Sequence, residues 1–157
     1  MKHLADFFKS TASLLEYPED LDYECFVVYE ISLKEASLES ALKMFNEMNP
    51  LKTWDWPFEL CMEKYKQIEG SEAAPYLIHF IGDHLRYENG ASISEERLEE
   101  LAQIFIQGEW GSIYVNHGSI TRHGCSFSIV RCPECHESFM ALVGADKVRM
   151  LNCWESD

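Results

Sequence analysis

The chain has few cations for its length. Its 157 residues contain 13 Lys and Arg against 27 Asp and Glu, which gives a formal net charge of −14. Direct binding to nucleic acid or to an anionic membrane is therefore disfavoured, because both depend on basic patches. If the chain has a protein partner, this charge favours a basic one.

Long apolar runs and the common catalytic patterns are also missing. No segment approaches the roughly 18 apolar residues that span a bilayer, and Asp6 and Lys9 interrupt the apolar residues near the start. We therefore expect a cytoplasmic protein without a secretory signal, whose six cysteines are buried thiols or metal ligands rather than disulfides. G-x-S-x-G, P-loop, G-x-G-x-x-G and H-E-x-x-H patterns do not occur, which favours a binding protein over an enzyme.

Acidic residues and cysteines are concentrated in different parts of the chain. Residues 1–110 carry 22 Asp and Glu and 9 Lys and Arg, a net charge of −13, whereas residues 111–157 carry 5 and 4, a net charge of −1. Four of the six cysteines lie after residue 124. Because the length suits one ordinary domain, we predict a single domain, 1–157, with an acidic and mainly helical part and a β-rich Cys/His part.

The first 110 residues predict about five helices and one strand. The strand covers 23–31, and its second face is only half polar, which is typical of a covered strand. Ser32 with Glu35 and Ser92 with Glu95 form capping-box pairs ahead of two helices. The expected helices have apolar residues at helical spacing and cover 3–15, 32–49, 57–70, 73–87 and 92–108.

After Gly111 the apolar period changes from 3.6 towards 2. Short strands are expected at 112–115, 125–131, 138–143 and 147–151, separated by glycine or polar turns. The predicted fold class is therefore α+β, in which a helical part with one strand is followed by a C-terminal antiparallel β-meander.

The stretch "RCPECHES", residues 131–138, carries the most distinctive chemistry. Cys132 and Cys135 are separated by two residues, and a meander that returns along 147–151 would bring Cys153 to the same end of the sheet. Three thiolates suit zinc. "CPEC" resembles the first knuckle of zinc ribbons over the stretch from Cys132 to Cys153, although "LNCW" supplies only one further cysteine. We predict a structural zinc site held by Cys132, Cys135 and Cys153, with His136 the nearest candidate for the fourth ligand.

Other readings of the cysteines stay open. Glu155, Asp157 or a second chain could supply the fourth ligand, and a knuckle without metal is the alternative to zinc. "CPECH" matches the C-x-x-C-H pattern of covalent haem attachment, which is disfavoured because that attachment takes place on the export side. A thioredoxin-like motif is disfavoured because the residues that follow read as a strand rather than a helix.

The acidic part supplies the candidate binding residues. Trp54 and Trp56 flank Asp55 just before an expected helix, and tryptophan is enriched at binding hot spots. The glutamates of the last helix look like a solvated face rather than an acid/base pair. The predicted partner-binding residues are Trp54, Asp55, Trp56, Glu95, Glu96, Glu99 and Glu100.

Together these features predict a small acidic binding protein. We expect an inhibitor, immunity or regulatory protein that docks a basic protein such as a toxin or nuclease. Toxin-neutralising immunity proteins, nuclease inhibitors and DNA-mimic inhibitors share this general character. No catalytic residue is assigned. The alternatives are a zinc-dependent enzyme or metal-responsive regulator centred on the Cys/His cluster, and a subunit or adaptor of a larger assembly.

Overall fold

The computed structural model describes residues 2–3, 26–48, 58, 60–89, 94–116, 118–121, 124–127 and 135–156. Within these residues the elements, in chain order, are β1 (Lys2–His3), β2 (Phe26–Ser32), α2 (Leu38–Met48), the short 3₁₀ turn η2 (Met62–Lys64), β3 (Tyr65–Ile68), α3 (Gly70–Asn89), α4 (Glu95–Ile106), β4 (Ser112–Asn116), β5 (Gly118–Thr121), β6 (Gly124–Phe127), β7 (Cys135–Val143) and β8 (Lys147–Ser156).

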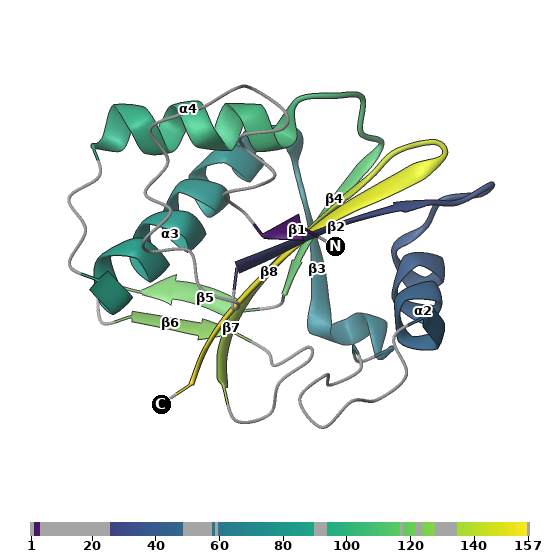
Figure 1. Ribbon diagram of the computed structural model, residues 1–157, viewed down its shortest axis with the longest axis horizontal. Helices are drawn as coiled ribbons and strands as arrows, with labels where there is room; N and C mark the ends of the chain where they lie inside the picture. Colours follow the sequence, from purple (N-terminus) through teal and green to yellow (C-terminus); the bar gives the residue numbers. More distant parts are fainter. Residues whose placement is uncertain are drawn as a thin grey trace.

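Strands from both halves of the chain form one sheet of six strands in the order β1-β2-β8-β7-β4-β3 (Figure 1). Every neighbouring pair is antiparallel. The β7–β8 hairpin lies in the middle, with the early strand β2 on one side and β4 and β3 on the other. Strands β5 and β6 pair with each other in a separate two-stranded ribbon. The acidic first part and the β-rich last part therefore share a sheet.

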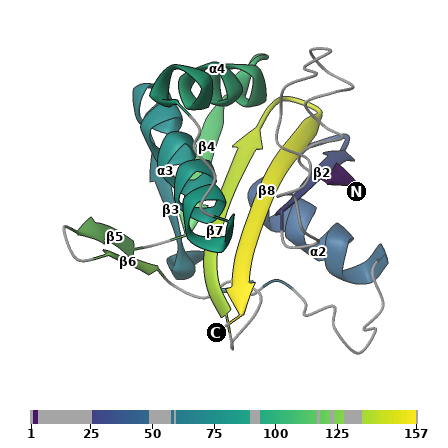
Figure 2. The same cartoon turned by 60° about the vertical axis from the view of Figure 1, so that its left-hand side comes forward.

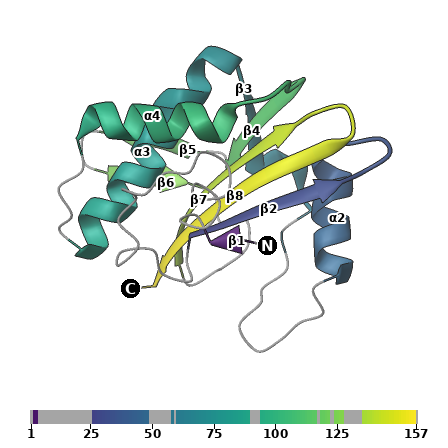
Figure 3. The same cartoon turned by 45° about the horizontal axis from the view of Figure 1, so that its top comes forward.

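Helices cover both faces of this sheet, so the molecule has three layers (Figures 2 and 3). Successive side chains of a strand point to opposite faces, and β7 follows this rule with apolar residues on both. Met140 and Leu142 belong to the cluster packed against α3 and α4. Phe139, Ala141 and Val143 belong to the cluster packed against α2. Because both faces are buried, the middle strands are apolar almost throughout.

The helices are amphipathic, as their sequences indicate. In α4 the buried residues are Leu98, Leu101, Ala102 and Phe105, a spacing of three and four that places them on one face. Ser94 caps α4 by accepting a hydrogen bond from the Arg97 amide. None of the helices in the described ranges is both long and apolar enough to cross a bilayer.

The expectation of about five helices with one strand in the first part, followed by a meander, is wrong. The described residues hold three α-helices, and the first part contributes β3 to the sheet as well as β2. The helix expected at 57–70 is instead the turn η2 followed by β3. Tyr65 and Ile68, three residues apart, suggested one helical face, but in a strand they point to opposite faces. Both are buried because this sheet is covered on both sides.

Several boundaries also differ from the expectation. Helix α2 begins at Leu38, and Ser37, not Ser32, caps it through a hydrogen bond from the Ser40 amide. Of the strand expected at 125–131, residues 125–127 belong to β6, which pairs with β5 and not with the main sheet, and residues 128–131 lie outside the described residues. The strands at 26–32, 112–116, 135–143 and 147–156 and the helices at 70–89 and 95–106 confirm their predictions, within a few residues. The helix expected at 3–15 lies outside the described residues.

Phe139 should be among the residues on which stability most depends. Its ring is fully buried and makes edge contacts with Phe58 and Tyr65, with centroids 5.4 Å apart in each case. We expect Phe139→Ala to lower the free energy of unfolding by about 3–5 kcal/mol, because it leaves a cavity. Leu60→Ala, at an exposed position, should change it by less than about 0.5 kcal/mol. Urea denaturation monitored by circular dichroism measures both, and equal effects would contradict the core assignment.

Candidate functional site

A buried arginine closes the C-terminal end of α4. Arg149 lies on β8, is only 8% exposed, and donates from Nη1 to the carbonyl oxygens of Phe105 at 2.6 Å and Gln107 at 3.4 Å. The last carbonyls of a helix have no partner within the helix, and a cation there is favoured by the helix dipole. Arg149 therefore supplies both the donors and the charge that this end requires.

The same guanidinium also contacts strand β2, the neighbour of β8 in the sheet. Its Nε lies 2.7 Å from Oε1 of Glu30, which is the residue directly opposite Arg149 in the β2–β8 ladder. The Glu30 side chain is 49% exposed, so solvent weakens this ion pair. The contact with the Phe105 carbonyl is the stronger part of the arrangement, because it is short and buried.

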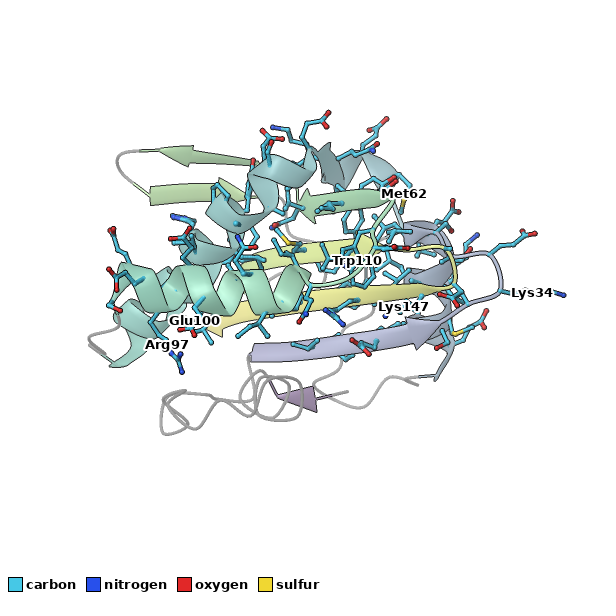
Figure 4. The ribbon with its side chains drawn as sticks, turned by 90° about the horizontal axis from the view of Figure 1, so that it is seen from above. Lys34, Met62, Arg97, Glu100, Trp110 and Lys147 are labelled. Carbon is cyan, nitrogen blue, oxygen red and sulfur yellow. The ribbon has the colours of Figure 1, made fainter. Side chains whose placement is uncertain are left out.

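Trp110 is held beside Arg149 by a second contact with the helix end. Its Nε1 donates to the Ile106 carbonyl oxygen at 2.9 Å. The ring centroid lies 5.1 Å from Cζ of Arg149 and 5.3 Å from Nζ of Lys147. Lys147 and Arg149 are two residues apart on β8 and so share a face of the sheet. Figure 4 shows Trp110 beside Lys147, near the turn of the hairpin.

Glycines allow the segment after α4 to approach the hairpin turn closely. Gly108 has a φ of +135°, and a Cβ there would lie 3.2 Å from the Trp110 ring. A Cβ on Gly144 would lie 3.2 Å from the Glu109 carbonyl oxygen. The Gly111 amide donates to the Val143 carbonyl oxygen at 2.8 Å, which joins the two segments. A larger residue at Gly108 or Gly144 would therefore clash with the segment that carries Trp110.

Two open hollows share Trp110 and Gly111 in their lining. One has a volume of about 410 Å³ and is lined by residues 67–70 and 110–113. The other has a volume of about 670 Å³ and is lined by residues 109–111 and 144–147. Their lining includes three carboxylates, from Glu69, Glu109 and Asp146, and one cation, Lys147. We call these four residues together with Trp110 the Trp110 surface; its net charge is −2.

The glutamates predicted to bind a partner lie on the exposed side of α4. Glu95, Glu96, Glu99 and Glu100 are all exposed, opposite the apolar face that the helix buries. Arg97 lies 2.6 Å from Glu100 and forms an ion pair with it. Three further carboxylates remain on this face. Trp54, Asp55 and Trp56, the other predicted contacts, lie outside the described residues.

The predicted metal ligands are described only through their backbone. Cys135 begins β7 opposite Ser156, and Cys153 on β8 pairs with Ser138, so both cysteines lie near the same end of the hairpin. Three rungs separate them, about 10 Å along the strands. With Zn–S bonds of about 2.3 Å, the two thiolates could bind one zinc ion only if the strand pairing at Cys135 opened. His136 is in β7, and Cys132 lies outside the described residues. Within the residues that the structure describes, no three potential ligands form a metal-binding group.

No family model, curated protein or solved structure matches this chain. Its function must therefore be inferred from its own residues.

Trp110, Lys147 and Arg149 were not among the residues predicted from the sequence. One local signal is "GEWG", in which glycines bracket a tryptophan directly after a helix. Another is "KVRML", where a charged residue stands within an apolar strand. Neither pattern shows that the two segments meet, since Arg149 and Phe105 are 44 positions apart.

Removing Arg149 should loosen the end of α4 more than removing its carboxylate partner. We expect Arg149→Met to lower the free energy of unfolding by about 2–4 kcal/mol, because the buried Phe105 carbonyl loses its donor. Glu30→Gln should cost about 1 kcal/mol or less, because Glu30 is half-exposed. Denaturation curves of the two variants provide the comparison. Equal losses would mean that Arg149 stabilises the fold mainly through its ion pair with Glu30 and not through its contacts with the helix end.

Proposed function

We propose that this chain is a small acidic cytoplasmic binding protein that docks a basic protein partner, as an inhibitor, immunity or regulatory protein does. The observation that carries the proposal is the exposed face of α4. Four glutamates lie there within six residues, on a helix whose opposite face is fully buried. The chain as a whole has a net charge of −14, so the long-range field also attracts cations.

The arrangement of these glutamates is costly for an isolated helix. Glu95 and Glu99 are four residues apart, as are Glu96 and Glu100, and like charges at this spacing destabilise a helix by a few tenths of a kcal/mol per pair. The helix dipole offsets part of this cost in the first turn, and Arg97 neutralises Glu100. Repulsion among the remaining carboxylates would be relieved when a partner brings its own cations to this face.

Such a face would act chiefly on the rate and specificity of association. Complementary charge steers the encounter of two proteins and excludes wrong partners more than it adds affinity. Because the charges are exposed, salt screens them over a distance of about 8–10 Å. Binding through α4 should therefore weaken as the salt concentration rises.

The proposal includes a structural zinc site at Cys132, Cys135 and Cys153, with His136 as the nearest fourth ligand. It is supported by the donor set, since thiolates are preferred zinc ligands. In the hairpin register Cys135 and Cys153 are three rungs apart, so zinc binding would require the pairing at Cys135 to open. In this role the metal would hold the C-terminal strand without taking part in binding.

Neutralising the α4 face should remove the partner. The test variant is Glu95→Gln with Glu96→Gln and Glu99→Gln, which leaves the Arg97–Glu100 pair intact. The matched control is Glu35→Gln with Glu47→Gln and Glu63→Gln, which changes the charge equally at exposed positions outside α4. In affinity isolation from the native cell, we expect a basic protein with the wild type and the control, released by about 0.5 M salt, and at least a tenfold loss with the α4 variant. Equal capture by both variants would refute the role of α4.

Zinc should be measurable in the purified chain. We expect about one zinc ion per chain, and its loss in Cys132→Ser and in Cys153→Ser together with a lower melting temperature, because structural zinc contributes to folding. Cys61→Ser, at an exposed cysteine, is the control and should keep both metal and stability. A metal-free wild type with an unchanged melting temperature in chelator would exclude the site.

A further inference from the structure

The chain places one of its own cations against Trp110. Nζ of Lys147 lies 5.3 Å from the centroid of the ring, within the range of a cation–π contact. Lys147 is exposed and Trp110 is partly exposed, so solvent reaches the position that the ammonium group occupies. The ring therefore accepts a cation at a place that another molecule can reach.

Two acidic residues line the same hollow. Glu109 and Asp146 line the 670 Å³ hollow together with Trp110 and Lys147, and both are exposed. Asp146 is the neighbour of Lys147 in the hairpin turn, and Glu109 is the neighbour of Trp110. An incoming cation that displaced Lys147 would thus meet the Trp110 ring in a hollow lined by two acidic residues. The buried Arg149, 5.1 Å from the ring centroid and paired with Glu30, would remain in place.

We propose that the Trp110 surface binds an arginine side chain of a basic partner, whose guanidinium replaces Lys147 on the Trp110 ring and pairs with Glu109 and Asp146. Arginine fits better than lysine because its planar guanidinium stacks on aromatic rings and pairs with carboxylates in two-pronged geometry. The involvement of a protein partner rests on the function proposed above, whereas the arginine site itself rests on the geometry around Trp110.

The ring is prepared for such a contact before the partner arrives. The hydrogen bond to the Ile106 carbonyl and the contact with buried Arg149 hold it in one orientation, so little conformational freedom is lost on binding. Helix α4 has 12 residues and is about 18 Å long. Glu95 and Trp110 therefore lie towards opposite ends of it, and the acidic face and the Trp110 surface can be tested separately.

Removing the Lys147 ammonium group from the Trp110 ring should strengthen the binding of an arginine probe. The probe is fluorescein-labelled hexa-arginine, titrated with the full chain at about 50 mM salt and followed by fluorescence anisotropy. We expect Lys147→Gln to lower Kd about threefold or more, which corresponds to the worth of an exposed cation–π contact. Lys34→Gln changes the net charge equally at an exposed residue that points away from Trp110 in Figure 4. Lys34→Gln should lower the Kd of hexa-arginine less than twofold. The decrease in Kd caused by Lys147→Gln should be smaller for hexa-lysine than for hexa-arginine.

Removing the ring or its carboxylates should cancel this gain. Trp110→Leu in the Lys147→Gln background, and Glu109→Gln with Asp146→Asn in the same background, should each raise Kd at least fivefold. The matched control for the carboxylates is Glu35→Gln with Glu47→Gln, which removes two exposed charges elsewhere. Circular dichroism melting establishes that each variant is folded. The inference is overturned if Lys147→Gln and Lys34→Gln change the Kd of hexa-arginine equally. It is also overturned if the Glu109/Asp146 variant and the Glu35/Glu47 control raise this Kd equally.

The two proposals fail in different ways. If the α4 variant loses a native basic partner while hexa-arginine responds equally to Lys147→Gln and Lys34→Gln, the binding function stands and the arginine site is excluded. If hexa-arginine responds specifically to Lys147→Gln but no partner depends on α4, the arginine site stands and the proposed function fails.

Discussion

Arg149 connects three elements that come from distant parts of the chain. Its guanidinium contacts the end of α4, Glu30 on β2 and the ring of Trp110, while its backbone belongs to β8. A buried cation is tolerable only when hydrogen bonds replace its water, and here the carbonyls at the helix end and one carboxylate do so. The path of the chain between Ile106 and Gly111, and with it the position of the Trp110 surface, follows from these contacts.

The three-layer packing explains which elements could be predicted from the sequence. Helix α4 was predictable because its four buried residues repeat at helical spacing and Ser94 caps it. Strand β3 was not, since Tyr65 and Ile68 have the same spacing as two residues of one helical face. Only the presence of α2 on one face of the sheet and of α3 and α4 on the other makes both buried. Nor does local spacing show that strands of the first part enter the sheet of the last part, because β2 pairs with β8 across more than a hundred residues.

The candidate site was only half predictable. The exposed glutamates of α4 could be inferred from one helix, because local spacing decides which face is polar. The larger hollow of the Trp110 surface depends on two segments that meet through tertiary contacts, one before β4 and one at the turn between β7 and β8. The glycines that allow this approach, Gly108 and Gly144, look in the sequence like ordinary turn residues. Their importance appears only when the Trp110 ring is seen against them.

The charge distribution links stability to binding. In so acidic a chain a buried arginine benefits from the surrounding negative field as well as from its direct partners, so Arg149 can be fixed inside while the carboxylates stay outside. The exposed glutamates of α4 repel one another and contribute little to folding, whereas the end of the same helix is held firmly by Arg149 and Trp110. One helix thus combines an acidic face suited to attract a cationic partner with a rigid end suited to orient it. The exposed charge of the α4 glutamates would speed association with a cationic partner. The fixed position of Trp110 would limit the conformational entropy lost on binding.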